Sequence, residues 1–140
     1  MLFGAEHVKR YRETGGAEGH DWQGTTVLIL TTTGRRSGEL RSTPLIYREV
    51  GATGGYAVVA SNGGGDEPNW YLNLVENPEV EVQVKDDVFP AHARVATADE
   101  KPDLWKELVA TWPQYDEYQA KATREIPVVV LDRNFADSTD

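Results

Sequence analysis

A short basic turn bracketed by glycines is the strongest candidate for binding an anion. The turn reads Gly34-Arg35-Arg36-Ser37-Gly38, and Arg41 follows it. Glycines let backbone N–H groups approach a ligand, arginines present forked donors, and the serine adds a hydroxyl. Short basic turns are also common on protein surfaces, so this spacing leaves both an anion site and an ordinary exposed hairpin open.

Polar side chains also follow an expected strand near the middle of the chain. Ser61 and Asn62 precede three successive glycines, which suits a loop that grips the edge of a planar heterocycle. Trp70 and Asn73 come next, three residues apart and therefore on one face of an expected short helix. A mobile loop and a tryptophan packed in the core would explain the same residues, so both interpretations stay open.

A third group of aromatic side chains lies near the carboxyl end. Tyr115 and Tyr118 are three residues apart and are separated from Trp112 by Pro113. Aromatic residues at this spacing usually pack in a core, but the neighbouring acidic and amide residues predict a partly wet helix. The tyrosines therefore line either a cleft or the core, and in a cleft either hydroxyl can donate to a substrate oxygen.

Conventional catalytic groups are otherwise scarce. The chain has no cysteine, and its three histidines, His7, His20 and His92, lack the spacing of a helical metal pair, so no metal site is expected. It contains no glycine-rich dinucleotide fingerprint, no phosphate-loop lysine and no nucleophile elbow around a serine. Any chemistry is therefore expected to come from a bound cofactor.

The pattern of apolar residues predicts an α+β fold built on an antiparallel barrel. Six strands are expected, at residues 25–32, 41–50, 56–61, 79–85, 88–97 and 127–131. Helices are expected at 5–13, at 70–76 after an Asn69 cap, after an Asp99 cap as far as Trp112, and at 114–122. The connections are too short for a parallel doubly wound sheet. One domain is expected over residues 1–140, with a disordered tail after about residue 133.

Charge is distributed unevenly along the 140 residues, whose net charge is −9. Residues 1–48 hold seven basic and five acidic side chains, whereas the remainder holds seven basic and eighteen acidic ones. This argues against a nucleic-acid partner, which requires a broad positive face, and favours one localised site for a small anion. The sequence has neither a signal peptide nor a membrane span, so a cytoplasmic location is expected.

Taken together, these segments resemble the deazaflavin-dependent nitroreductase family of actinobacterial split β-barrel oxidoreductases. The resemblance extends over about residues 5–133. The residues that carry it are His20-Asp21-Trp22, the run from Leu30 to Gly38, Arg41, Pro44-Leu45-Ile46-Tyr47, Ser61, Trp70-Tyr71-Leu72-Asn73-Leu74, Asn77-Pro78, Tyr115, Tyr118-Gln119 and Ile126-Pro127-Val128-Val129-Val130.

The resemblance implies a split β-barrel that transfers hydride from C5 of reduced coenzyme F-420, an 8-hydroxy-5-deazaflavin. Quinones, nitroaromatics and activated alkenes are the implied acceptors. The acceptor would lie against Ile46, Trp112, Tyr115 and Tyr118, with Tyr115 favoured over Tyr118 as the catalytic donor. The implied cofactor-binding residues are Gly34, Arg35, Arg36, Ser37, Gly38, Glu39, Arg41, Pro44, Ala60, Ser61, Asn62, Asn69, Trp70, Tyr71 and Asn73.

Three positions depart from the family pattern. Asn62 stands where many relatives carry lysine, and Trp112 and Ile46 stand where some carry tyrosine. These departures predict a drier substrate pocket with fewer proton donors, so the sequence does not decide whether nitroaromatics are reduced. Two alternatives also stay open: an FMN-dependent reductase or oxidase on the same barrel, and a non-catalytic deazaflavin-binding protein. Peripheral membrane contact, the oligomeric state and the physiological acceptor are not decided by the sequence.

Overall fold

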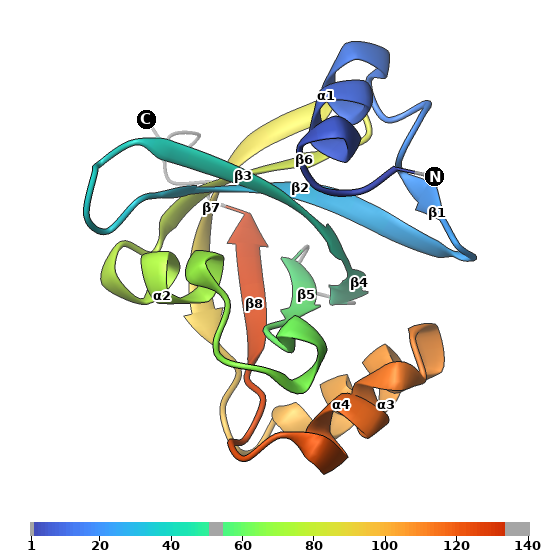
Figure 1. Cartoon of the computed structure of the whole chain (residues 1–140), viewed down its shortest axis with the longest axis vertical. Helices are drawn as coiled ribbons and strands as arrows, with labels where there is room; N and C mark the ends of the chain where they lie inside the picture. The colour runs from blue at the N-terminus through green and yellow to red at the C-terminus, as the bar shows by residue number, and fades with distance from the viewer. Residues whose placement is uncertain (1, 51–54, 134–140) are drawn as a thin grey trace.

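The structure, a computed structural model, describes residues 2–50 and 55–133. The expected tail after residue 133 and the expected turn at 51–54 lie outside these described residues. The elements run in the order α1 (Gly4–Thr14), β1 (Asp21–Trp22), β2 (Thr25–Thr33), β3 (Leu40–Ile46), β4 (Arg48–Val50), β5 (Gly55–Val59), the 3-10 turn η2 (Asn62–Gly64), α2 (Asn69–Glu76), β6 (Glu79–Val84), β7 (Asp87–Val95), α3 (Lys101–Thr111), α4 (Gln114–Lys121) and β8 (Val128–Arg133) (Figure 1).

The strands form one antiparallel sheet that curls back on itself. Its order is β2-β6-β7-β8-β5-β4, and β3 pairs with the other edge of β2. Because β3 and β4 are separated only by Tyr47, the bent segment Leu40–Val50 pairs with β2 at its start and with β5 at its end. Counting this segment as one strand gives the six-stranded antiparallel barrel that the sequence predicts. The two-residue strand β1 falls in a segment predicted to be a loop.

Strand β2 is buried on both faces, which explains its uninterrupted apolar run. Leu28 and Leu30 point into the main core inside the barrel. Val27 and Ile29 point to the other face, where Val8 and Tyr11 of α1 cover them. Apolar side chains on successive residues are therefore all removed from water, as expected for a strand that lies between two packed layers.

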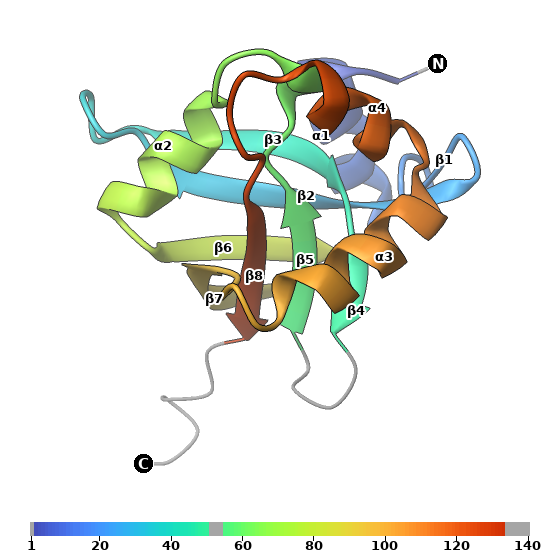
Figure 2. The same cartoon turned by 90° about the horizontal axis from the view of Figure 1, so that it is seen from below.

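Helices α3 and α4 cover the outer face of β5 and β8 (Figure 2). Val128 and Val130 of β8 pack there against Leu104 and Leu108 of α3, while Val129 and Leu131 point into the barrel. The all-apolar sequence of β8 follows from this burial on both faces. The polar–apolar alternation of β6 has the opposite cause over its first four residues, where Val80 and Val82 are buried and Glu79 and Glu81 are exposed; Gln83, also polar, is buried.

Both predicted helix caps are wrong. Helix α2 begins at Asn69 itself, after Pro68, and the Asn69 side chain accepts a hydrogen bond from Arg35 rather than from its own helix. Asp99 lies before α3, where Thr97 and Glu100 instead form reciprocal side-chain-to-backbone bonds of 3.2 and 2.8 Å. That pair is a capping box, which satisfies two backbone donors at once.

Helix α1 is fixed to the barrel by one buried hydroxyl. The Oη atom of Tyr11 accepts a 2.7 Å bond from the Lys85 N–H and lies 3.4 Å from the Gln83 carbonyl. Glycine at position 16 allows the backbone after α1 to lie against the backbone of Lys85, because a Cβ there would lie 2.5 Å from the Cα of Lys85. Among the described residues, no helix is long and apolar enough to cross a membrane.

Candidate active site

The basic turn is a closed loop between β2 and β3. The Gly34 N–H donates to the Glu39 carbonyl over 2.7 Å, and the Gly38 N–H donates to the Gly34 carbonyl over 2.9 Å. Gly38 has a φ of +75°, a conformation that side-chain-bearing residues rarely adopt. The Glu39 N–H donates to Ser37 Oγ over 3.1 Å. The loop therefore satisfies much of its own backbone and leaves its side chains to make other contacts.

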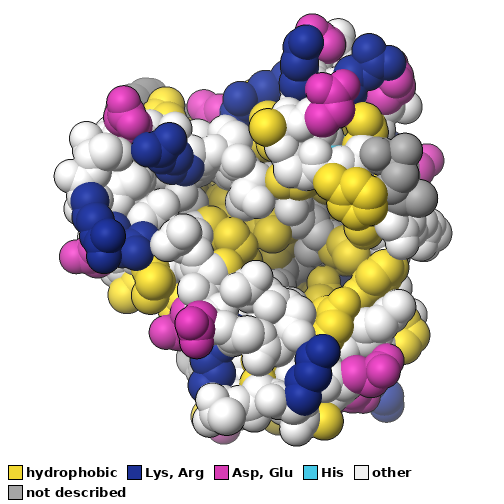
Figure 3. Space-filling model, viewed as in Figure 1, with side chains coloured by type: hydrophobic (Ala, Val, Ile, Leu, Met, Phe, Trp, Pro, Cys, Tyr) yellow, Lys and Arg dark blue, Asp and Glu magenta, His cyan; other side chains and the backbone are white. Residues whose placement is uncertain are grey.

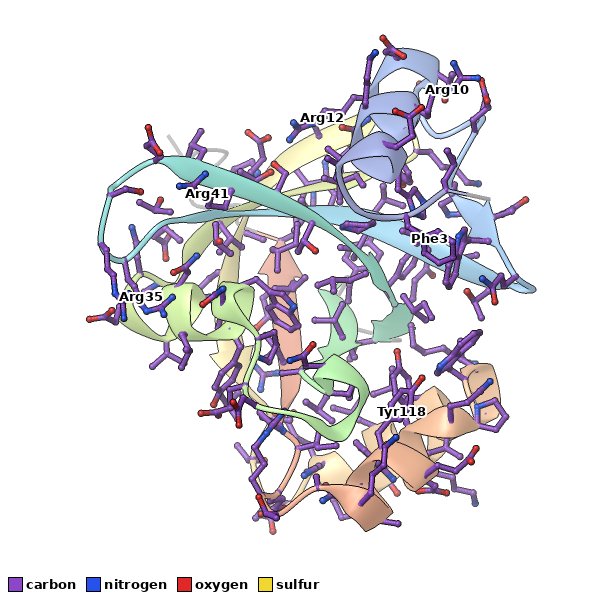
Figure 4. All side chains as sticks on the ribbon, viewed as in Figure 1. Phe3, Arg10, Arg12, Arg35, Arg41 and Tyr118 are labelled. Carbon is purple, nitrogen blue, oxygen red and sulfur yellow. The ribbon has the colours of Figure 1, made fainter. Side chains whose placement is uncertain are left out.

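The three arginines of this hairpin have different partners. Arg35 donates to Asn73 Oδ1 through its backbone N–H and Nη1, at 3.1 and 2.9 Å. Arg41 pairs with Glu39 over 3.1 Å at a site where both side chains are more than half exposed. Arg36 is exposed. Arg35 thus holds the hairpin against α2, while Arg36 and Arg41 are the more accessible cations. Figure 4 labels Arg35 and Arg41 on either side of this hairpin.

Asn73 joins three elements at the base of the site. It is only 4% exposed, accepts both bonds from Arg35, and donates through Nδ2 to Thr32 Oγ1 over 3.2 Å. A buried amide with all of these bonds made holds its neighbours in place. The Trp-Tyr-x-Asn segment therefore serves to position the basic hairpin against α2.

Two adjoining cavities open beside this hairpin. The first has a volume of about 500 Å³ and lies between the hairpin and α2. Its lining contains three arginines and no acidic side chain, which favours an anionic ligand. The lining residues are Gly34, Arg35, Arg36, Ser37, Arg41, Ser42, Thr43, Asn69, Trp70 and Asn73.

The second cavity, of about 400 Å³, is mainly apolar and aromatic. It shares Thr43 and Trp70 with the first, so the two cavities adjoin at these residues, and together they are called the cleft below. Figure 3 shows its yellow floor between the upper and lower parts of the molecule, with dark blue basic side chains to the left. The lining residues are Phe3, Gly4, His7, Trp22, Val27, Thr43, Pro44, Leu45, Ile46, Val59, Ser61, Asn62, Gly63, Trp70, Trp112, Tyr115 and Tyr118.

Aromatic rings connect the two sides of the second cavity. Trp22 contacts Phe3 at 5.6 Å between centroids and Trp112 at 6.0 Å. Its indole N–H donates to the Leu2 carbonyl over 2.9 Å, which holds the N-terminal segment in place. The start of α1 and the end of α3 therefore meet over the cleft through Trp22.

The two candidate tyrosines differ in their surroundings. Tyr115 is 5% exposed and packs between the rings of Trp105 and Tyr118. Burial raises the pKa of Tyr115 well above that of a free phenol, so its hydroxyl stays protonated. Tyr118 is partly exposed, projects from α4 toward the cleft (Figure 4), and has Oη 3.5 Å from the Trp112 indole nitrogen.

The loop after β5 is tied to the segment that follows α4. Arg124 donates through Nη2 to the carbonyls of Ala60 and Ser61, at 3.0 and 3.2 Å, and through Nε to that of Gly65 at 3.0 Å. Gly64 packs so closely on α4 that a Cβ there would lie 2.8 Å from the Tyr118 carbonyl. These contacts hold in place the loop that carries Ser61 and Asn62.

Most of the expected site residues lie around this cleft, but four line neither cavity. These are Gly38, Glu39, Ala60 and Tyr71, and the ring of Tyr71 packs against Trp70 and the core. Ser42 and Thr43 of β3, together with Phe3 and His7 at the start of the chain, line the cavities but were not expected from the sequence, and Leu45 was marked only by the resemblance. Trp22 was marked only by the resemblance. Among the described residues, no three His, Asp or Glu side chains gather as a metal site.

The curled antiparallel sheet and its covering helices define the class of protein, a split β-barrel. A heme storage protein from Vibrio cholerae has the same fold, with a TM-score of 0.60 at 15% identity over 95% of this chain and 92% of that one. A likeness at such low identity is evidence for the fold alone. It agrees with the split barrel expected from the sequence.

Closer relatives give the family. The family model described as F-420H(2)-dependent quinone reductase matches residues 4–133. The F-420H(2)-dependent quinone reductase of Mycobacterium tuberculosis is 38% identical over 133 residues, which cover 91% of this chain and 87% of that protein. A solved structure described as an F-420-H2 dependent reductase is 42% identical, with a TM-score of 0.69 over 76% of this chain and 93% of that one.

The chain belongs to the F-420H(2)-dependent quinone reductase family. It is therefore a deazaflavin-dependent oxidoreductase, and its cofactor is coenzyme F-420. The family, the enzyme class and the cofactor expected from the sequence are confirmed. The roles of the individual site residues stay predictions.

Proposed function

We propose that this enzyme reduces quinones with reduced F-420, holding the anionic tail of the cofactor in the first cavity and the ring and acceptor in the second. The observation that carries this proposal is the junction of the two cavities at Thr43 and Trp70. One cavity is basic and the other aromatic, and a molecule with an anionic tail and a planar head needs both, side by side.

The first cavity fits the tail of the cofactor. Arg36 and Arg41 are the accessible cations, and the Ser37 and Ser42 hydroxyls line the same space. Arginine binds phosphate and carboxylate groups with paired N–H donors. In an acidic protein, this concentration of positive charge favours binding of the polyanion at one place.

The second cavity fits the deazaflavin ring and an acceptor. Pro44, Ser61 and Asn62 come from the strand and loop that face Trp70, while Ile46 and Trp112 lie on the acceptor side. When bound, the reduced deazaflavin supplies a hydride from C5. The protein binds both partners in contact and excludes water with aromatic walls, which converts an encounter of two molecules into a reaction within one complex.

Tyr118 is the better placed of the two tyrosines to donate a hydrogen bond to the acceptor oxygen. Its ring is partly exposed and its oxygen is approached by the Trp112 N–H, which leaves the phenolic hydrogen for a ligand. Tyr115 is held more deeply between two rings. A neutral donor stabilises charge that develops on a quinone oxygen without full proton transfer.

Quinones suit this pocket better than the other expected acceptors. Nitroaromatics and activated alkenes are also flat or electron-poor, so we expect them to bind. Reduction of a nitro group consumes more protons, however, and Ile46 and Trp112 bring no hydroxyl to the cavity. We therefore expect quinones to be reduced faster than nitroaromatics of the same size.

Titration of the purified protein with F-420 and with FMN, followed by fluorescence, tests the proposal. We expect much tighter binding of F-420, followed by oxidation of reduced F-420 when a soluble quinone such as menadione is added. Equal affinity for both cofactors would favour the FMN-dependent alternative. Tight F-420 binding without turnover of any quinone, nitroaromatic or activated alkene would favour a non-catalytic binding protein.

A further inference from the structure

The second cavity has one side chain that neither the sequence analysis nor the proposal above assigns. His7 lies on the buried face of α1 beside Val8 and Tyr11 and is only 2% exposed, yet it lines the cavity. Among the described lining residues there is no carboxylate, lysine or arginine. His7 is therefore the side chain in this lining whose two ring nitrogens can each donate or accept a hydrogen bond.

The ring of His7 is held in one orientation. Its Nε2 lies 2.8 Å from the Gly19 carbonyl, and because a carbonyl only accepts, Nε2 carries a hydrogen. Gly19 has a φ of +108°, and a Cβ there would lie 3.0 Å from His7 Cδ2. The ring of Trp22 packs beside that of His7 with its centroid 6.0 Å away.

This arrangement leaves Nδ1 available to a ligand. No hydrogen bond joins Nδ1 to another described residue, whereas Nε2 is bonded to Gly19. The Nε2 and Cδ2 atoms face Gly19, so Nδ1, on the other side of the ring, is the ring nitrogen left for a ligand. Which ring nitrogen of a histidine meets a ligand is set by the hydrogen bond that the other nitrogen makes.

We propose that His7 contacts an oxygen of the acceptor through Nδ1 and supplies the proton that completes its two-electron reduction. This inference rests on the quinone reduction proposed above. The ligand class is a quinone and its hydroquinone product. Tyr118 on α4 and His7 on α1 approach the same cavity from different elements, and the two could serve different oxygens of one quinone.

Hydride transfer breaks the C5–H bond of the reduced deazaflavin, which becomes the oxidised cofactor, and leaves the quinone as a hydroquinone monoanion that has gained two electrons and one proton. The monoanion takes one proton from Nδ1 of the protonated imidazole. The products at this point are neutral hydroquinone and a neutral imidazole that keeps its hydrogen on Nε2. Water at the cavity mouth, where Phe3 is 61% exposed, returns the proton to Nδ1.

The test begins with binding. The chain has three histidines, so ring-nitrogen NMR of histidine-labelled protein is assignable by single substitutions. With oxidised F-420 bound, addition of menadiol, the hydroquinone of menadione, should shift the Nδ1 signal of His7. The signals of His92, which is exposed and bonded to Glu79, should stay in place. An unmoved His7 signal, while menadiol quenches tryptophan fluorescence, would overturn the proposal.

Turnover gives the second readout. In His7→Gln the amide nitrogen can still donate to Gly19, but the atom equivalent to Nδ1 is lost. We expect quinone turnover to fall by about 100-fold, within the range of a lost proton donor, while F-420 affinity and the melting temperature stay near those of the parent. His92→Gln is the matched control and should retain full turnover. Parent-like turnover in His7→Gln would refute the role of His7. Failure of the parent to bind F-420 or to reduce menadione would instead refute the proposed function.

Discussion

Glu39 and Arg41 provide a sensitive test of the tail site, because their effects on cofactor affinity should have opposite signs. The Glu39 carboxylate lies 3.1 Å from the Arg41 guanidinium, and their side chains are 70% and 62% exposed. An anionic tail must share Arg41 with Glu39 and is repelled by the same carboxylate. We therefore expect Glu39→Gln to tighten F-420 binding and Arg41→Ala to weaken it.

The magnitudes follow from the exposure of this pair. Two unit charges 4 Å apart in water interact by about 1 kcal/mol, and exposed ion pairs contribute about 0–1 kcal/mol. Glu39→Gln should accordingly tighten binding by about twofold to fivefold, which corresponds to about 0.5–1 kcal/mol. Arg41→Ala removes a charged donor that is largely in water, so we expect a loss of about 1 kcal/mol, or about fivefold.

Fluorescence titration with F-420 at two salt concentrations measures both effects. At about 0.01 M salt the screening length is about 30 Å, and at about 1 M it is about 3 Å. Both changes should therefore shrink markedly at high salt. Glu107→Gln is the charge-matched control, since Glu107 is exposed on α3 and lines neither cavity. Weaker F-420 binding by Glu39→Gln at low salt, or an unchanged affinity of Arg41→Ala, would show that the tail does not lie along this hairpin.

Three further predictions follow from the contacts that support the cleft. Asn73→Ala should lower the free energy of unfolding in urea by about 1–3 kcal/mol, since it leaves buried polar partners unsatisfied, and should also weaken F-420 binding because Arg35 loses its main acceptor. Burial raises the pKa of Tyr11 to about 12, so the protein should lose stability as pH rises from about 10 through 12, and Tyr11→Phe should show a smaller loss than the parent in thermal melts, because burial also raises the pKa of Tyr115. Tyr118→Phe should slow quinone reduction by about 10- to 1000-fold with little change in melting temperature, whereas Tyr115→Phe should have the smaller effect; the reverse order would favour Tyr115 as the donor.

The strands could be predicted because the order of polar and apolar residues in each strand follows which of its faces are buried. The alternation of β6 and the apolar run of β8 each reflect which faces are covered. The closure of the barrel could not be predicted in this way. Residues 41–50 read as one strand, and nothing local marks Tyr47 as the point where pairing passes from β2 to β5.

The helix starts show a different limit. Asn69 is a residue type that often caps helices, but in the fold its side chain oxygen is occupied by Arg35, thirty-four residues earlier in the chain. Asp99 has the right chemistry for a cap, yet Thr97 and Glu100 make the capping bonds. Which side chain caps a helix depends here on which hydrogen-bond partner lies nearest in the fold, and the sequence alone does not give those distances.

The candidate site likewise has a part that is marked by a local sequence and a part that depends on residues far apart in the chain. The anion-binding turn was apparent because glycine, arginine and serine carry their chemistry within one short segment. His7 and Phe3 were missed because α1 brings them to the cavity only after Tyr11 docks against the β6–β7 hairpin. In the sequence alone, His7 is one polar residue on an amphipathic helix, and its spacing from other residues does not indicate a binding site.

One strand connects the two halves of the cleft. Arg41 at the start of β3 lines the basic cavity, Thr43 lines both cavities, and Ile46 at the end lines the aromatic cavity. At about 3.4 Å per residue, the five steps from Arg41 to Ile46 span roughly 17 Å. Backbone pairing with β2 extends over this whole length and fixes the spacing of these residues. If the ligand lies as proposed, we expect the distance between its anionic end and its planar end to be set by this backbone pairing rather than by side chains, so substitutions in β3 that preserve pairing should change affinity without changing where the ring lies.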